Sequence, residues 1–159
     1  MSDQESADRA FRAVEREVAL LFRRGRARSA EMARRVHPEL EGAAYAMLAY
    51  VEESGRVRLT DIGLHFGIGK ASISRQVKHL EELGLVRREV DPLDRRSSLV
   101  SLTGDGAARY LRARDARMGR FRELMAAWDE EDVVRFAELL GRFNDLAAES
   151  MRPAESAPA

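Results

Sequence analysis

The sequence has no cysteine, and this absence excludes several kinds of protein at once. Without thiols there is no disulfide framework, no thiolate metal site and no cysteine-based redox switch. No stretch approaches the roughly 18 uncharged apolar residues of a membrane span, so we expect no membrane partner. The N-terminus is polar and acidic, unlike a secretory signal. Together these features favour the cytoplasm.

Signatures of catalysis are also missing. The sequence has no nucleophile elbow, no phosphate-binding glycine loop and no metal-ligand spacing. Its three histidines, His37, His65 and His79, are scattered and lack a carboxylate pair at ligand spacing, so we interpret them as surface or helix-joint residues. Neighbouring carboxylates such as Glu81–Glu82 resemble ordinary helix-surface charge. We therefore expect no enzyme, no cofactor and no metal.

The charge is balanced overall but unevenly distributed. The 27 Lys and Arg residues equal the 27 Asp and Glu residues. Residues 54–100 contain nine Lys and Arg and six Asp and Glu, so this window carries +3 and the rest of the chain −3. Such an asymmetry predicts a modestly basic face on a neutral particle.

Amphipathic helices are predicted at the N-terminal end. Apolar residues recur at helical spacing over about 7–28, and a polar joint is expected over about 26–38. Pro38 suits the first turn of a second helix, where its missing N–H costs nothing. That helix should stop near Ser54–Gly55, since glycine is preferred just past a helix end.

The middle of the chain has shorter elements separated by glycines. We expect a short helix over 61–66 capped by Thr60, a turn at 67–69 and a helix over 70–83 ended by Gly84. Two alternating runs, RREV and SLVSL, flank the turn-forming DPLD and predict a β-hairpin. Ile68, between the two turn glycines, should point into the small core.

The C-terminal part should be helical again. Thr103 is placed to cap a long helix running to about Trp128, and Asp129 to cap a final one. The tail at 151–159 has the composition of a disordered end. Long helices with strong apolar stripes outside a small central module must bury them, and a second copy of the chain is the simplest partner.

Residues 58–106 combine a helix-turn-helix pattern, a hairpin bearing Asp94–Arg96, and Leu102-Thr103-x-x-Gly106. This combination resembles the multiple-antibiotic-resistance regulator (MarR) family, with agreement from roughly Pro38 to Gly106. Gly63 and Gly69 depart from the pattern, since relatives often have Ala and Ser or Thr there. The resemblance implies a mainly α fold with a small β-hairpin wing. It also implies four parts: an N-terminal dimerisation helix (1–36), a winged helix-turn-helix module (37–104), C-terminal dimerisation helices (105–150) and the tail (151–159).

The predicted DNA contacts lie on the second helix of the module and on the wing. Arg75, with Ser74 and Lys78, suits base edges, because arginine pairs bidentately with guanine. Lys70 and Ser72, in the first turn, suit phosphate. The resemblance further implies that Arg96 enters the minor groove and that Asp94 holds its guanidinium by a charge-assisted pair. Arg95 is expected to contact phosphate or to act as simple solubilising charge. For Arg87 and Arg88, phosphate contact and simple solubilising charge remain equally open.

The resulting hypothesis is a homodimeric, sequence-specific regulator that binds a pseudo-palindromic double-stranded operator. As in the family, we expect a repressor released by a small effector such as an aromatic or phenolic acid, with Arg16, His37 or Tyr45 near the effector. Two alternatives remain open: an activator using the same DNA contacts, and a winged-helix scaffold for protein binding. The scaffold predicts a neutral or apolar recognition face, which the cations of the second helix do not favour.

Overall fold

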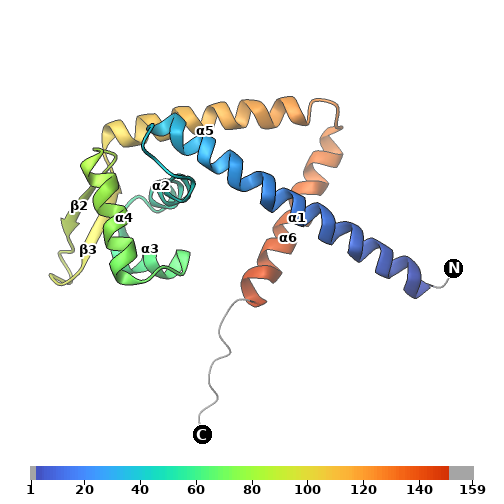
Figure 1. Cartoon of the computed structure of the whole chain (residues 1–159), viewed down its shortest axis with the longest axis horizontal. Coiled ribbons are helices and arrows are strands. Elements are labelled where there is room, and N and C mark those ends of the chain that lie inside the picture. The colour runs from blue at the N-terminus through green and yellow to red at the C-terminus, as the bar shows by residue number, and fades with distance from the viewer. Residues whose placement is uncertain (1–2, 151–159) are drawn as a thin grey trace, which may run out of the picture. The chain divides into compact units, whose positions relative to one another are not determined.

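The computed structural model describes residues 3–150, which are mainly helical with one small antiparallel sheet (Figure 1). The elements are, in chain order, α1 (Asp3–Val36), α2 (Gly42–Ser54), β1 (Val57–Arg58), α3 (Leu59–Phe66), α4 (Lys70–Glu82), β2 (Val86–Val90), β3 (Ser98–Leu102), α5 (Gly104–Leu124) and α6 (Glu130–Ser150). The predicted fold class is confirmed. Contacts divide the chain into two compact units, one ending at Arg117 and one beginning at Met118. Among the described residues, no helix is both long and apolar enough to cross a membrane.

Helix α1 is one continuous helix of 34 residues, so the predicted polar joint is wrong. The segment at 26–36 contains no glycine or proline and is rich in Arg and Ala, both good helix formers. Three of its apolar side chains, Met32, Ala33 and Val36, are buried in the core, which rewards continuing the helix. The sequence pattern missed this because the apolar stripe thins out between Phe22 and Met32.

Helix α2 starts four residues later than predicted, at Gly42 and not at Pro38. Pro38 lies in a turn, where the backbone N–H of Leu40 donates to the carbonyl of His37 at 3.0 Å. The start of α2 is fixed against α1, because the Ser29 hydroxyl donates to the carbonyl oxygen of Gly42 at 2.8 Å. The end of α2 at Ser54 is confirmed, and Gly55 after it has a φ of 70°.

The helix-turn-helix is formed by α3 and α4. Helix α3 begins at Leu59, directly after β1, so the predicted cap at Thr60 is wrong and Thr60 lies inside the first turn. Gly67 ends α3 in the left-handed region, at a φ of 62° that glycine adopts without strain. Ile68 packs against the core as expected, and its carbonyl oxygen would be 3.0 Å from a Cβ on Gly63. This close approach explains why a glycine is present at position 63.

The sheet has the order β1-β3-β2, with both pairs antiparallel. The hairpin of β2 and β3 confirms the predicted wing, with Val86 opposite Leu102 and Val90 opposite Ser98. Strand β1 was not predicted, because two residues are too short to show a periodicity. Val57 of β1 pairs with Val100, and both side chains are buried. The helices and the sheet of the module therefore share one hydrophobic core.

The Leu102-Thr103-x-x-Gly106 motif joins the wing to α5. The Thr103 hydroxyl accepts from the backbone N–H of Gly106 at 2.9 Å, which confirms the predicted cap, and donates to the Gly84 carbonyl at 2.6 Å. The Thr103 backbone N–H donates to the carbonyl of Leu85 at 3.0 Å. Gly106 lies so close to this segment that a Cβ there would overlap the Leu85 carbonyl group. The motif thus pins the start of α5 to the end of α4.

The second unit contains the end of α5 and the whole of α6. Helix α5 ends at Leu124, four residues before the predicted Trp128, and α6 follows directly after Asp129. The ring of Trp128 contacts Phe136 with centroids 5.6 Å apart. Most of the large apolar side chains here are exposed, namely Met118, Phe121, Leu124, Trp128, Val134, Phe136, Leu139, Phe143 and Leu146. The predicted disordered tail at 151–159 lies outside the described residues.

Candidate nucleic-acid interface

Helix α4 has one face buried in the module and one face in solvent. Ile73, Val77 and Leu80 are buried in the core, at spacings of four and three residues. The side chains predicted to meet DNA lie off this stripe: Lys70, Arg75 and Lys78 are exposed, and Ser72 and Ser74 are half-buried. Gly69 occupies the N-cap position without a side-chain cap, and its carbonyl accepts from the backbone N–H groups of Ser72 and Ile73.

The cations of α4 are largely free of internal partners. Within residues 3–149, no ion pair involves Lys70 or Arg75. Lys78 has a weak pair, its Nζ lying 3.6 Å from Glu82 Oε1 with both side chains well exposed. Such exposed helix pairs contribute little and exchange readily for a phosphate. The exposed face of α4 therefore presents positive charge to an outside partner.

The wing tip carries two further exposed cations, Arg95 and Arg96, and no ion pair holds either guanidinium within the described part of the chain. The expectation that Asp94 pairs with the Arg96 guanidinium is wrong. Asp94 Oδ1 accepts instead from the Arg96 backbone N–H at 3.0 Å. Aspartate readily forms this local turn with the amide two residues on. Asp94 thus shapes the loop that displays Arg96 and leaves the guanidinium available.

The base of the wing is fixed by a pair that the sequence analysis missed. Asp91 is 2% exposed, and its Oδ2 lies 2.8 Å from Arg58 Nε on β1. Its Oδ1 accepts from the Leu93 backbone N–H at 2.9 Å. These two donors, the Leu93 amide first and Arg58 second, lower the pKa of Asp91, and the carboxylate raises the pKa of Arg58. The Asp-Pro sequence indicated a turn, but no local signal identified its distant partner.

Arg87 and Arg88 are engaged within the sheet. Arg87 Nε donates to the Ser101 hydroxyl at 3.1 Å, and Arg88 Nη2 donates to the Ser98 hydroxyl at 3.4 Å. Glu89 adds acceptors nearby, with Oε2 at 2.7 Å from Arg56 Nη2 and Oε1 at 3.5 Å from Arg87 Nε. These arginines are therefore bonded within the hairpin, unlike the two arginines at its tip.

Helix α4 and the wing belong to the same compact unit, and Figure 1 shows the hairpin of β2 and β3 beside α4. A helix with a cationic exposed face therefore lies next to a hairpin with a cationic tip. In a duplex, a helix fits the major groove, and an arginine fits a narrow minor groove.

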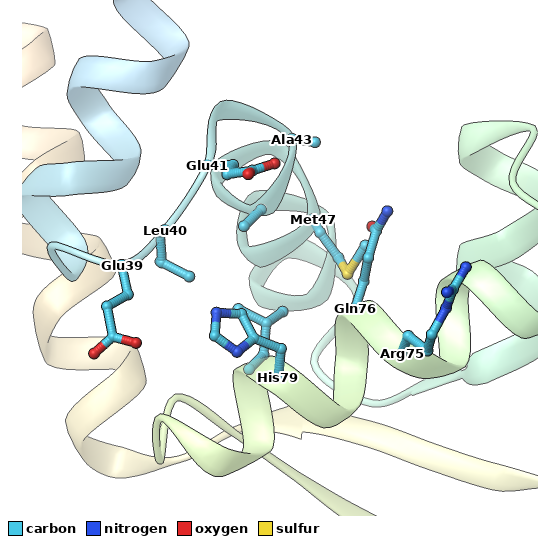
Figure 2. Close-up of a pocket in the computed structure, with 10 residues that line it drawn as sticks. Glu39, Leu40, Glu41, Ala43, Met47, Arg75, Gln76 and His79 are labelled. Carbon is cyan, nitrogen blue, oxygen red and sulfur yellow. The ribbon is translucent and has the colours of Figure 1, made fainter.

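A cavity of about 300 Å³ lies between α4 and the segment that leads into α2 (Figure 2). Its lining residues are Glu39, Leu40, Glu41, Ala43, Ala44, Met47, Arg75, Gln76, His79 and Leu80. The Oε1 atom of Gln76 is buried without a hydrogen-bond partner among the described residues. No sequence signal indicated this cavity, because its two sides are 28 or more residues apart.

A tyrosine pair connects α2 and α5. The rings of Tyr45 and Tyr110 lie 5.5 Å apart, and the Arg117 guanidinium carbon lies 5.7 Å from the Tyr45 ring centroid. The Tyr45 hydroxyl is buried with no partner among the described residues. Burial raises the pKa of Tyr110. Of the three residues suggested for an effector site, Tyr45 lies in this cluster, whereas Arg16 is exposed on α1 and His37 lies in the α1–α2 connection.

The three histidines lie in different surroundings. His37 Nδ1 accepts from the Glu39 backbone N–H at 3.3 Å, His65 stacks on Tyr50 with centroids 4.0 Å apart, and His79 lines the cavity. Within the described residues, no three His, Cys, Asp or Glu side chains are gathered as metal ligands.

Comparison with known proteins agrees with this geometry. Residues 39–97 match the profile of the MarR family. The uncharacterized HTH-type transcriptional regulator YxaD of Bacillus subtilis (strain 168) is 30% identical over 105 residues, which cover 66% of this chain and 73% of that protein.

Solved structures share the fold at lower identity. A MarR transcriptional regulator from Methanosarcina mazei Go1 superposes with a TM-score of 0.75 at 17% identity, covering 88% of this chain and 99% of that one. A mutant of MarR from E. coli, complexed with operator DNA, superposes with a TM-score of 0.61 at 18% identity, covering 80% of this chain and 93% of that one.

The fold and the match to the MarR family define a winged helix-turn-helix DNA-binding protein. The chain belongs to the MarR family, whose members are transcription regulators and not enzymes.

Proposed function

We propose that the protein is a homodimeric regulator that binds a pseudo-palindromic operator. Each protomer places α4 in a major groove and its wing tip in the adjacent minor groove. The observation that carries this proposal is the set of exposed cations without strong internal partners on α4 and the wing tip. The structural relative from E. coli, which was solved with operator DNA, supports the same use of the fold.

The individual roles follow from position. Arg75, at the centre of the exposed face of α4, pairs with a guanine edge, with Ser74 and Lys78 beside it. Lys70 and Ser72 lie in the first turn, where phosphate is favoured by the helix N-terminus. At the wing tip, Arg96 enters the minor groove and Arg95 contacts phosphate.

Asp94 acts through the backbone. Its hydrogen bond to the Arg96 amide holds the turn in the form that projects the Arg96 side chain. This differs from a charge-assisted pair, because the carboxylate does not engage the guanidinium, which stays free to contact DNA. The role therefore depends on an oxygen acceptor at position 94, not on a negative charge.

Dimerisation rests on apolar surface left uncovered in each unit. In the second unit, the exposed aromatic and aliphatic side chains of α5 and α6 recur at helical spacing. In the first unit, Phe11, Val14, Leu21 and Phe22 of α1 are all more than half exposed. Surfaces of this kind mark protein interfaces. A second copy of the chain would cover them and set two copies of α4 about one DNA turn apart.

The regulatory hypothesis is a repressor released by a small aromatic or phenolic acid. The Tyr45–Tyr110 cluster supports this hypothesis in two ways. The Arg117 guanidinium is a cation that would attract the carboxylate of the acid. The buried Tyr45 hydroxyl lacks a hydrogen-bond partner, and the acid would supply an acceptor for it. Release requires that the acid bind more tightly to a conformation with low operator affinity.

Equilibrium binding tests the DNA part of the proposal. Fluorescence anisotropy would compare DNA from upstream of the protein's own gene with a scrambled duplex, at several salt concentrations. We expect tighter binding to the native duplex and a steep fall with salt from phosphate contacts. Equal, weak binding to both duplexes, together with no enrichment in a random-sequence selection, would contradict it.

A further inference from the structure

The geometry of the α2–α4 cavity points to a second ligand site, distinct from the tyrosine cluster. We propose that this cavity binds a small organic cation with a single apolar ring, and that binding changes operator affinity through Arg75. The regulatory half of this inference rests on the proposed DNA-binding function. The binding half does not, and it is tested without DNA.

The floor of the cavity is apolar and is formed by residues of the hydrophobic core. Leu40, Met47 and Leu80 are buried and line it from the α1–α2 connection, α2 and α4 respectively. Ala43 and Ala44 have small side chains, so the space between the two helices stays open. A volume of about 300 Å³ is at the small end of ligand sites and suits a molecule with one ring.

The charge of the lining favours a cation. Glu39 and Glu41 contribute two carboxylates, and neither takes part in an ion pair among the described residues. Arg75 contributes one positive charge, so the lining carries −1 with His79 neutral. Figure 2 shows the Glu39 and Arg75 side chains at opposite ends of the view. An ammonium group near the carboxylates would therefore face little opposition from the guanidinium.

The orphaned acceptor of Gln76 supports the same ligand class. Its Oε1 atom is buried and lacks a donor among the described residues, and buried acceptors in this state are unusual because they cost free energy. An ammonium group supplies up to three N–H donors, whereas a carboxylate supplies only acceptors. A ligand with an ammonium group therefore brings the kind of donor that the amide oxygen lacks, as well as the positive charge that the carboxylates favour.

The link to DNA is helix α4 itself. Arg75, Gln76, His79 and Leu80 all belong to α4, and Arg75 also lies on the exposed face proposed to read bases. A ligand seated against Arg75 favours side-chain positions that differ from those needed for a guanine contact. Coupling between two sites on one side chain needs no movement of distant elements, only unequal affinity for the two positions.

The binding half is tested by calorimetry on the free, full-length protein. Three probes share a phenyl ring and differ in the head group: 2-phenylethylamine (cation), 2-phenylethanol (neutral) and 3-phenylpropionate (anion). We expect the amine to bind most tightly. Equal or tighter binding of the propionate, or no binding of the amine, would overturn the proposed ligand class.

Variants locate the site. The double substitution Glu39→Gln with Glu41→Gln should weaken amine binding by roughly tenfold, since two exposed charge pairs are lost. Ala43→Leu should abolish it by filling the cavity mouth; Ala43 is exposed and lies outside the core, so the fold is left intact. Glu53→Gln on α2 does not line the cavity and should have no effect. Amine binding that survives both cavity variants would overturn this location.

The regulatory half is tested on the operator. The amine should change operator affinity by about fivefold or more, and Ala43→Leu should remove this response without altering affinity in the absence of amine. Amine binding without any change in operator affinity would overturn the regulation while leaving the site. Amine binding by a protein that binds no operator would instead contradict the proposed function.

Discussion

Arg58 and Asp91 form an ion pair between β1 and the start of the wing loop, with Arg58 Nε 2.8 Å from Asp91 Oδ2. The loop is closed at the same point, since the Asp91 backbone N–H donates to the Ser97 carbonyl at 3.1 Å. Asp91 is almost fully buried, whereas Arg58 is 44% exposed by its side chain. One carboxylate therefore positions the whole segment that carries Asp94, Arg95 and Arg96.

Asp91→Asn should lower the melting temperature, because it removes the buried carboxylate that pairs with Arg58 and accepts from the Leu93 amide. The loss should depend on pH. The pKa of Asp91 is lowered by the fold, so its contribution is complete above the unfolded pKa of about 3.9 and is lost as pH falls through the folded pKa. Thermal melts of both proteins between about pH 3 and 7 should differ most above about pH 4 and draw together as the pH falls below it.

The exposed Asp145→Asn on α6 serves as the control for this series and should melt like the wild type at every pH. The difference in melting temperature between the wild type and Asp91→Asn should decrease on acidification. If it does not, the carboxylate charge has no role at the wing base.

Gly106→Ala should destabilise the protein by about 1–3 kcal/mol or more, because the new Cβ would overlap the Leu85 carbonyl and force the α5–β2 junction apart. Gly104→Ala is the matched control: it lies in the same helical turn, and a Cβ there meets nothing within 4 Å. Urea unfolding of the two variants provides the comparison. Equal stability of the two variants would contradict the close packing of Gly106.

Substitutions at Asp94 separate its two possible roles. Asp94→Asn keeps an oxygen acceptor for the Arg96 amide, so operator affinity should change less than about threefold. Asp94→Ala removes the acceptor and should weaken binding more, with little effect on the melting temperature because the residue is exposed. A loss for Asp94→Asn as large as that for Asp94→Ala would show that the charge matters after all.

Phe143→Glu on α6 should shift the protein from dimer to monomer, since a charge would be buried in the proposed apolar interface. Arg142→Glu changes the neighbouring exposed position and should leave the dimer intact. Light scattering during size-exclusion chromatography gives the mass directly. A wild-type protein that is monomeric at micromolar concentration would contradict the homodimer.

The sequence was most informative where local physics decides the structure. Ile73, Val77 and Leu80 recur at helical spacing, and α4 forms over 70–82, within one residue of the prediction. Gly84, at a φ of 71°, ends that helix for the reason expected of glycine. The Leu102-Thr103-x-x-Gly106 motif likewise has a local cap that could be predicted. These local signals predicted α4 and the start of α5 correctly.

Errors occurred where a distant segment overrides a local preference. The Ser29–Gly42 contact sets the start of α2, and Pro38 falls in the turn before it. Thr60 is not a cap because β1 pairs with β3 and α3 begins directly after β1, two residues earlier than predicted. Asp91 and the α2–α4 cavity depend on partners about 30 or more residues away, which no spacing rule relates.

The most direct test of the central claim is operator binding by Arg75→Ala and Arg96→Ala, measured by anisotropy beside Arg56→Ala. Arg56 is a third exposed arginine of the module, but it is paired with Glu89. Loss of the Arg75 contact should cost about 1–3 kcal/mol and relax base preference at one position, and Arg96→Ala should cost roughly tenfold or more in affinity.

Arg56→Ala should bind the operator like the wild type, and all three variants should melt normally because these side chains are exposed. This pattern would establish α4 and the wing tip as the two reading elements. Unchanged operator affinity in both Arg75→Ala and Arg96→Ala would contradict the account.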